Sequence, residues 1–111
     1  MCRALQVLCV AAGEPSLDAL KRAAVDQEWE VSGAVGADAA LREIDARQPH
    51  VLVTWGAFDG LVHEARERRP GLRIVAVGRA PIAEADVNVT SIKDVRNAIL
   101  GVPPAGGPVG G

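Results

Sequence analysis

Residues 5–20 read LQVLCVAAGEPSLDAL, and this stretch sets the pattern that decides the fold. Its first seven residues form an almost unbroken apolar run, which predicts a strand buried on both faces of a sheet. Gly13 ends the run, and Pro15 and Ser16 are typical of the first turn of a helix. The apolar residues that follow recur at helical spacing, so the stretch predicts a buried strand that leads directly into an amphipathic helix.

The same alternation of strand and helix continues along the chain. Further apolar runs predict strands at residues 51–55, 72–77 and 87–89, and a weaker run at 30–35 suits an edge strand. Helical apolar stripes separate the runs and begin at Leu17, Ala37, Phe58 and Ile92. Strands that alternate with helices pair in parallel through right-handed crossovers. We therefore predict an α/β fold with an open five-stranded sheet, in the order 2-1-3-4-5, and helices on both faces.

The connection between the fourth and fifth strands is short. Only residues 78–86 separate them, too few for a crossover helix, so we expect at most one helical turn near 82–85. A shortened fourth helix would leave roughly a few hundred Å² of apolar surface exposed, as at interaction sites, beside an unpaired strand edge. The candidate interface residues are Ile82, Ala85, Val87 and Val89. The alternative is that Ile82 and its loop fold down and cover this face.

Composition excludes several classes of function. The chain has 111 residues, 49% hydrophobic and 23% charged, which suits one globular domain. Its formal net charge of -2 provides no basic field for nucleic acid, and no apolar stretch approaches the ~20 residues of a membrane span. The opening residues do not fit a signal peptide, so we expect a cytoplasmic protein. Cys2 and Cys9 match no metal-binding spacing.

The two ends of the chain differ in composition. We predict a domain over residues 1–101 and a disordered tail over 102–111, because the ending is rich in proline and glycine and cannot bury apolar surface.

Four segments together resemble the receiver domain of bacterial response regulators. They are VLCVAAGEPSLDAL, PHVLVTWG, PGLRIVAVG and ADVNVTSIKDVRNAI, and the resemblance covers residues 5–100. It implies the flavodoxin-like, receiver-like version of the predicted fold. It also implies a regulatory role in two-component signal transduction.

The resemblance fails at the positions that carry receiver chemistry. Receivers have an acidic pair after the first strand, an acceptor aspartate ending the third, a threonine or serine ending the fourth, and a lysine ending the fifth. The matching positions here are Ala11 and Ala12, Trp55 (or Thr54 if the register slips by one), Gly78 and Ser91, and the switch aromatic matches Asn88. Mg²⁺ needs several oxygen ligands, and Glu14 is the only carboxylate nearby in the sequence. The sequence therefore predicts a pseudo-receiver that accepts no phosphoryl group, needs no cofactor and is not an enzyme.

Two functions fit a pseudo-receiver. The first is a regulatory module that binds a protein partner or a second copy of itself. The alternative is a small-ligand sensor at the carboxyl edge of the sheet, where such folds bind ligands. The pocket candidates are Ala11, Ala12, Gly13, Glu14, Thr54, Trp55, Gly56 and Gly78.

Three further side chains are of interest, and the first has two interpretations. Trp55 is either an anchor for a ligand or partner or a plug that fills the space of the missing acids. We expect Trp29 to be a partly buried cover near the end of the first helix, and His63 to lie on a solvated helix face among ordinary surface charges.

Overall fold

The computed structural model describes residues 5–25, 29–56, 58–79 and 82–100. One parallel sheet has the strand order β2-β1-β3-β4-β5, which confirms the predicted topology. The strands are β1 (Leu5–Ala11), β2 (Trp29–Val35), β3 (Val51–Trp55), β4 (Arg73–Val77) and β5 (Val87–Val89). The helices are α1 (Glu14–Ala24), α2 (Ala37–Arg47), α3 (Asp59–Arg68) and α4 (Val95–Leu100), with a short 3₁₀ turn, η1 (Ile92–Asp94), before the last.

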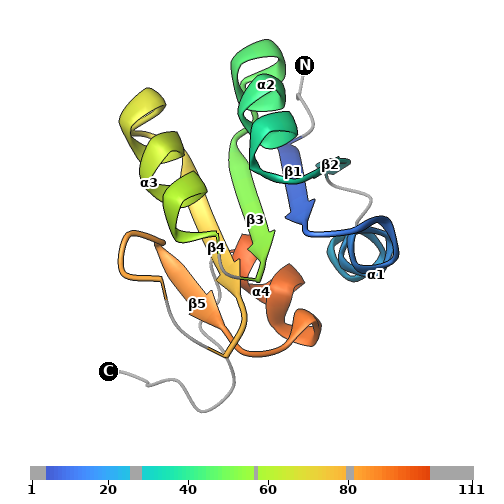
Figure 1. Ribbon diagram of the computed structural model, residues 1–111. Helices are drawn as coiled ribbons and strands as arrows, with labels where there is room; N and C mark the ends of the chain where they lie inside the picture. Colours follow the sequence, from blue (N-terminus) through green and yellow to red (C-terminus); the bar gives the residue numbers. More distant parts are fainter. Residues whose placement is uncertain (1–4, 26–28, 57, 80–81, 101–111) are drawn as a thin grey trace.

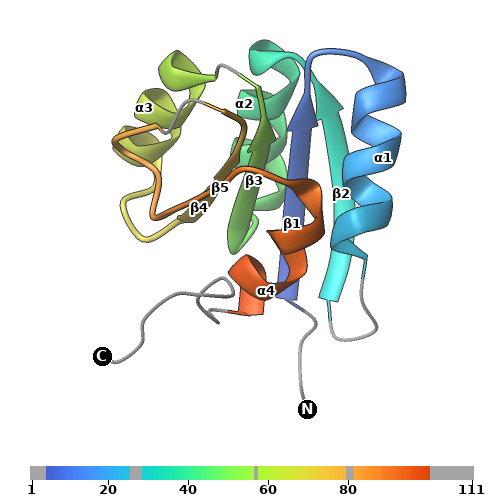
Figure 2. The same cartoon turned by 90° about the horizontal axis from the view of Figure 1, so that it is seen from below.

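The helices form two layers around the sheet. α1 and α4 cover one face, and α2 and α3 cover the other (Figures 1 and 2). This division follows from the right-handed crossovers of parallel strands. In the part of the chain that the structure describes, no helix is long and apolar enough to span a bilayer. The predicted tail, residues 102–111, lies outside the described residues.

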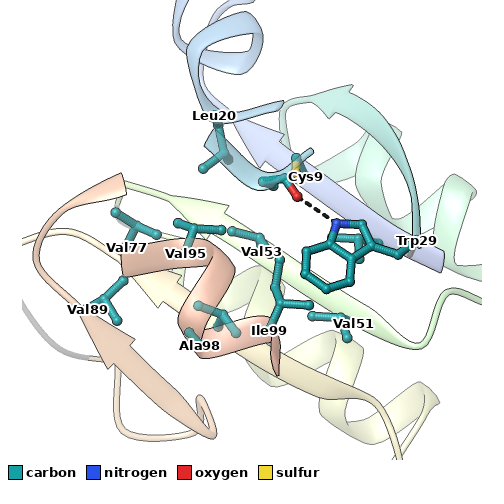
Figure 3. Packing of buried hydrophobic residues seen from close by; sticks show 13 residues of the cluster. Cys9, Leu20, Trp29, Val51, Val53, Val77, Val89, Val95, Ala98 and Ile99 are labelled. Atoms are coloured by element: carbon teal, nitrogen blue, oxygen red, sulfur yellow. Dashed lines mark hydrogen bonds between the residues drawn. The ribbon is translucent and has the colours of Figure 1, made fainter. Parts of the chain in front are cut away.

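Alternate residues of each strand build two apolar cores. On the α1/α4 face the core includes Val7, Cys9, Val53, Val75, Val95 and Ile99 (Figure 3). On the α2/α3 face it includes Leu8, Val10, Ile44, Leu52, Val62 and Ile74. Because both faces are covered, the central strands are apolar at nearly every inner position, and the sequence shows this as almost unbroken runs.

Cys9 is a free thiol that lies deep in the α1/α4 core. Its side chain is fully buried, and this burial raises the pKa of the thiol to about 12, against a smaller opposing effect of Lys21. The thiol therefore stays protonated and packs as a small apolar group.

Trp29 lies near the end of the first helix, as expected, but the expectation of a partly buried cover for the second strand is wrong. Trp29 is the first residue of β2, is only 5% exposed and belongs to the α1/α4 core. Its indole Nε1 donates a hydrogen bond to the carbonyl oxygen of Ala24 at 2.6 Å. The hydrogen bond satisfies the one polar group of a side chain that is otherwise buried among apolar neighbours.

The expected exposure beside the fifth strand is also wrong. Ile82 is only 4% exposed and packs in the α2/α3 core, and Val89 is 5% exposed in the opposite core. Residues 82–86 form turns that lie over the face where a fourth crossover helix would pack. Ala85 and Val87 are half-buried. The loop therefore covers the sheet, which is the alternative that the sequence left open.

Candidate functional site

The carboxyl edge of the sheet is where the predicted pocket residues meet. Parallel pairing places Ala11 beside Trp55, and Trp55 beside Val77, so the ends of the three central strands form one row. Ala11 is fully buried, whereas Ala12 is exposed and Gly13 is the residue before α1. The structure thus brings together the three strand ends that the sequence assigned to this site.

Backbone hydrogen bonds connect the loops at this edge to the strand ends, and the donors are glycines. Gly36 donates to the carbonyl of Ala11 at 3.0 Å, and Gly56 donates to the carbonyl of Val77 at 3.0 Å. Gly36 and Gly56 have φ of 87° and 121°, a region that favours glycine. A Cβ atom added at Gly78 would meet no atom within 4 Å, so Gly78 borders open space.

Trp55 and Thr54 point to opposite faces of the sheet. Trp55 is half-buried and packs against the α1/α4 core, whereas Thr54 is fully buried on the side of α2 and α3. The hydroxyl Oγ1 of Thr54 has no hydrogen-bond partner among the described residues. The indole therefore occupies part of the strand-end space, and the two candidate matches to a receiver's acceptor lie in different environments.

The residues at this edge do not fit Mg²⁺, the metal that the receiver fold implies. The side chains of Ala11, Ala12 and Trp55 contain no oxygen. The carboxylate of Glu14 is exposed on the first residue of α1. Mg²⁺ prefers near-octahedral oxygen coordination, and a single exposed carboxylate supplies too little of it.

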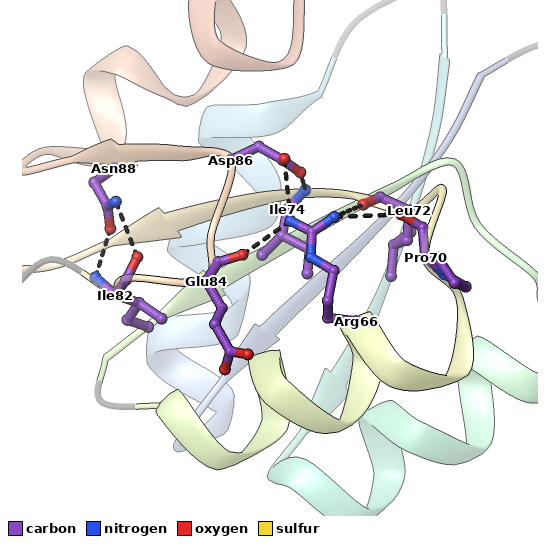
Figure 4. Close-up of polar contacts among 8 residues, drawn as sticks. All are labelled: Arg66, Pro70, Leu72, Ile74, Ile82, Glu84, Asp86 and Asn88. Carbon is purple, nitrogen blue, oxygen red and sulfur yellow. Dashed lines mark hydrogen bonds and ion pairs between the residues drawn. The ribbon is translucent and has the colours of Figure 1, made fainter.

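A second polar cluster joins α3 to residues 82–86 (Figure 4). The guanidinium of Arg66 donates to the carbonyl of Glu84 at 2.8 Å and forms an ion pair with Asp86 at 3.0 Å. Asp86 in turn accepts a hydrogen bond from the backbone N–H of Ile74 at 2.8 Å. Arg66 therefore ties the helix, the 82–86 segment and β4 together.

Asn88 holds the other end of the same segment. Its side-chain oxygen accepts from the N–H of Ile82 at 2.7 Å, and its amide nitrogen donates to the carbonyl of Ile82 at 3.1 Å. Asn88 is the position that matches the switch aromatic of receivers. Here its side chain forms hydrogen bonds with both backbone polar groups of Ile82, and the side chain of Ile82 packs in the α2/α3 core.

His63 lies on the exposed side of this cluster. Its Nδ1 is 2.9 Å from a carboxylate oxygen of Glu84, and its Nε2 is 3.2 Å from one of Glu67. The hydrogen bond to Glu84 and the negative charges of Glu84 and Glu67 raise the pKa of the imidazole. The prediction of a solvated helix face is confirmed by its exposure, but the contact with Glu84 was missed because 21 residues separate the two.

Ser91 also has a local structural role. Its hydroxyl accepts a hydrogen bond from the backbone N–H of Lys93 at 3.2 Å, at the start of η1. It stands at the position that matches a receiver's lysine and caps a turn there.

Comparison with known proteins identifies the fold. No protein-family model and no curated protein matches the chain. Among solved structures, the chain is similar to a response regulator receiver domain protein (CheY-like) from Methanospirillum hungatei. This match has a TM-score of 0.76, 20% identity, and coverage of 89% of this chain and 93% of that one.

Two more solved structures agree. The signal receiver domain of an HD domain-containing protein from Pseudomonas fluorescens has a TM-score of 0.78, 14% identity, and coverage of 90% and 94%. An orphan response regulator of H. pylori has a TM-score of 0.71, 13% identity, and coverage of 87% and 94%. At these identities the likeness shows a shared fold, and this fold is the receiver-like one that the sequence predicts.

Proposed function

We propose that this chain is a regulatory module that acts through contacts with protein and accepts no phosphoryl group. The observation that carries the proposal is the row formed by Ala11, Trp55 and Val77 at the carboxyl edge of the sheet. Phosphoryl transfer depends on metal ions and fixed cations that neutralise the charge on the transferred group. This row supplies apolar side chains where that chemistry needs carboxylates, and Ser91 stands where the resemblance sets the lysine, so we also expect no enzymatic activity.

Intact-mass spectrometry tests the absence of phosphorylation. The protein is incubated with acetyl phosphate and Mg²⁺, beside a receiver domain that has its acidic residues as a positive control. We expect the mass of this chain to stay unchanged while the control gains one phosphoryl group. An acid-labile gain of one phosphoryl group on this chain would contradict the proposal.

The β5 edge is the candidate surface for self-association. β5 has only three residues and lies at the end of the sheet, beside the half-buried Ala85 and Val87. An edge strand presents unpaired backbone groups that can pair with another chain. If two copies associate here, Ala85→Lys disrupts the dimer, whereas Ala46→Lys on the exposed side of α2 leaves it intact.

Light scattering over a range of concentrations measures this association. A protein that stays monomeric at high concentration would exclude a homodimer and leave a different protein as the partner. A dimer that both lysine variants weaken equally would place the contact away from β5.

A second candidate function is a small-ligand sensor at the same edge, and the observation that favours it is the partly exposed indole of Trp55 beside the strand ends. The half-buried Trp55 would report a ligand that enters there. A saturable change in indole fluorescence with a metabolite, abolished by Trp55→Phe and kept in Trp29→Phe, would support it. If Trp29→Phe abolishes the change and Trp55→Phe does not, the ligand lies elsewhere.

A further inference from the structure

The turn between α3 and β4, residues 70–72, separates two hollows at the amino edge of the sheet. One hollow has a volume of about 530 Å³ and also touches His50, Arg68 and Arg69. The other has a volume of about 390 Å³ and also touches Arg66, Arg73 and Asp86. Both hollows are lined by this turn on its two sides, and we call the pair of hollows the arginine trough. It lies at the opposite end of the strands from Trp55.

The first hollow presents hydrogen-bond donors and no acid. None of the described residues that line it is acidic. Arg68 is already paired with Asp45 at 2.6 Å, whereas Arg69 is half-buried and forms no ion pair with any described residue. An arginine held near the surface without a counter-charge is a ready partner for a carboxylate or phosphate.

His50 adds a neutral donor to the same hollow. Its Nδ1 accepts a hydrogen bond from the backbone N–H of Gln6 at 3.0 Å. In a neutral imidazole, an Nδ1 that accepts leaves the proton on Nε2. The exposed ring therefore offers an N–H donor beside Arg69 in the lining of the hollow.

The second hollow contains an unsatisfied arginine. The Nε of Arg73 is buried and has no hydrogen-bond partner among the described residues. The only acidic residue in the lining, Asp86, is already engaged by Arg66 at 3.0 Å and by the N–H of Ile74 at 2.8 Å. Arg73 as a residue is half-buried and forms no ion pair with any described residue, so the rest of its guanidinium can meet an incoming oxyanion.

We propose that the arginine trough binds an acidic segment of a partner protein, with the carboxylates of the segment meeting Arg69 and Arg73. The class of partner rests on the proposed function, a module that works by protein contact. Charge complementarity supports an acidic segment, because the unpaired cations are local. The whole chain has 12 basic and 14 acidic residues, so it carries no general attraction for anions.

The shape of the trough supports a segment over a single ion. Two adjoining hollows present cations on both sides of one turn, which suits successive carboxylates of an extended chain. The second hollow also reaches Val87, so the trough is continuous with the candidate β5 surface.

Fluorescence anisotropy with a fluorescein-labelled hexaglutamate peptide tests the proposal on the full chain at low ionic strength. We expect saturable binding that weakens with added salt. Arg69→Gln and Arg73→Gln each weaken it about tenfold, because each removes a charge-assisted hydrogen bond. The matched control is Arg22→Gln, which removes the same charge from an arginine that is 81% exposed on α1. This control leaves the affinity within about twofold.

The position of the peptide is read independently from the Arg73 Nε–H signal in ¹H–¹⁵N spectra. We expect this signal to shift on binding, because a carboxylate that pairs with the terminal nitrogens of the guanidinium changes the surroundings of Nε. Circular dichroism tests whether the variants remain folded. If Arg73→Gln unfolds, the comparison of affinities rests on Arg69→Gln and its control.

Three results would overturn the proposal. The first is that the peptide does not bind, and the second is an equal loss of affinity in Arg22→Gln and Arg69→Gln. The third is that inorganic phosphate saturates the trough and the peptide does not displace it. The last result would assign the site to a small anion. Each differs from failure of the proposed function, which appears as a phosphoryl group in the mass experiment.

Discussion

Arg66 shows how one side chain can stand in for part of a missing helix. Its guanidinium reaches the carbonyls of Leu72 and Glu84, at 3.3 Å and 2.8 Å, and the carboxylate of Asp86. These groups come from two separate stretches of chain, the turn before β4 and the 82–86 segment, so one planar donor fork satisfies acceptors on both. In the sequence, the same arginine reads as part of an ordinary charged helix face.

The contact of His63 with Glu84 predicts a measurable titration. The pKa of His63 in the folded protein lies above its ordinary value, chiefly through the hydrogen bond with Glu84. The contact therefore stabilises the fold below the ordinary pKa, and this contribution is lost as pH rises through the raised pKa. We expect Glu84→Gln to lower the pKa of His63 toward its ordinary value, and Glu67→Gln to lower it less.

NMR titration of the His63 ring protons measures both shifts, and Glu30→Gln, on a distant exposed residue of β2, is the control. If Glu84→Gln and Glu30→Gln leave the same His63 pKa, the imidazole does not pair with the 82–86 segment.

At the level of elements, the sequence predicted strands better than connections. The bounds of β1, β3 and β5 match the predicted runs. For β1 and β3 the reason is that a parallel strand buried on both faces appears as a nearly unbroken apolar run. Trp29 was not predicted as part of β2, which begins one residue earlier than its alternating pattern suggested. Periodicity does not show where the backbone turns from one element into the next.

The 82–86 segment could be predicted only in outline. Its short length follows directly from the sequence. The inward position of Ile82 depends on Asn88, whose side chain holds both polar groups of the Ile82 backbone. Asn88 lies six residues after Ile82, and no hydrophobic periodicity in the sequence identifies the contact between them. The interface expected at this segment therefore lacks its most apolar residue, because the side chain of Ile82 is buried in the core.

Ile82→Ala tests whether the segment is part of the core. Because Ile82 is only 4% exposed and packs in the α2/α3 core, we expect its truncation to lower the free energy of unfolding by about 2–4 kcal/mol. Urea denaturation measures the loss, and Val25→Ala, at a side chain that is 58% exposed, should change it by less than about 0.5 kcal/mol. Equal effects of the two substitutions would show that Ile82 does not cover the sheet.

At the scale of the whole molecule, the two edges of one sheet have opposite chemistry. The carboxyl edge ends in Ala11, Trp55 and glycines, whereas the amino edge gathers Arg69 and Arg73. The sequence placed the first edge correctly, because strand ends can be read from apolar runs. It did not reveal the second, since Arg73 begins a strand while Arg69 follows a helix, and only the turn between them brings both to the trough.

The central claim is that the carboxyl edge does not support metal-dependent phosphoryl transfer, and Mg²⁺ binding tests it most directly. The measurement is a titration with Mg²⁺ to millimolar concentration, followed on the backbone amides of Ala12, Gly56 and Gly78 in ¹H–¹⁵N spectra. We expect these signals to stay in place, because the adjacent side chains offer the metal no set of oxygen ligands. Saturable shifts confined to these amides would show a metal site at this edge and contradict the account.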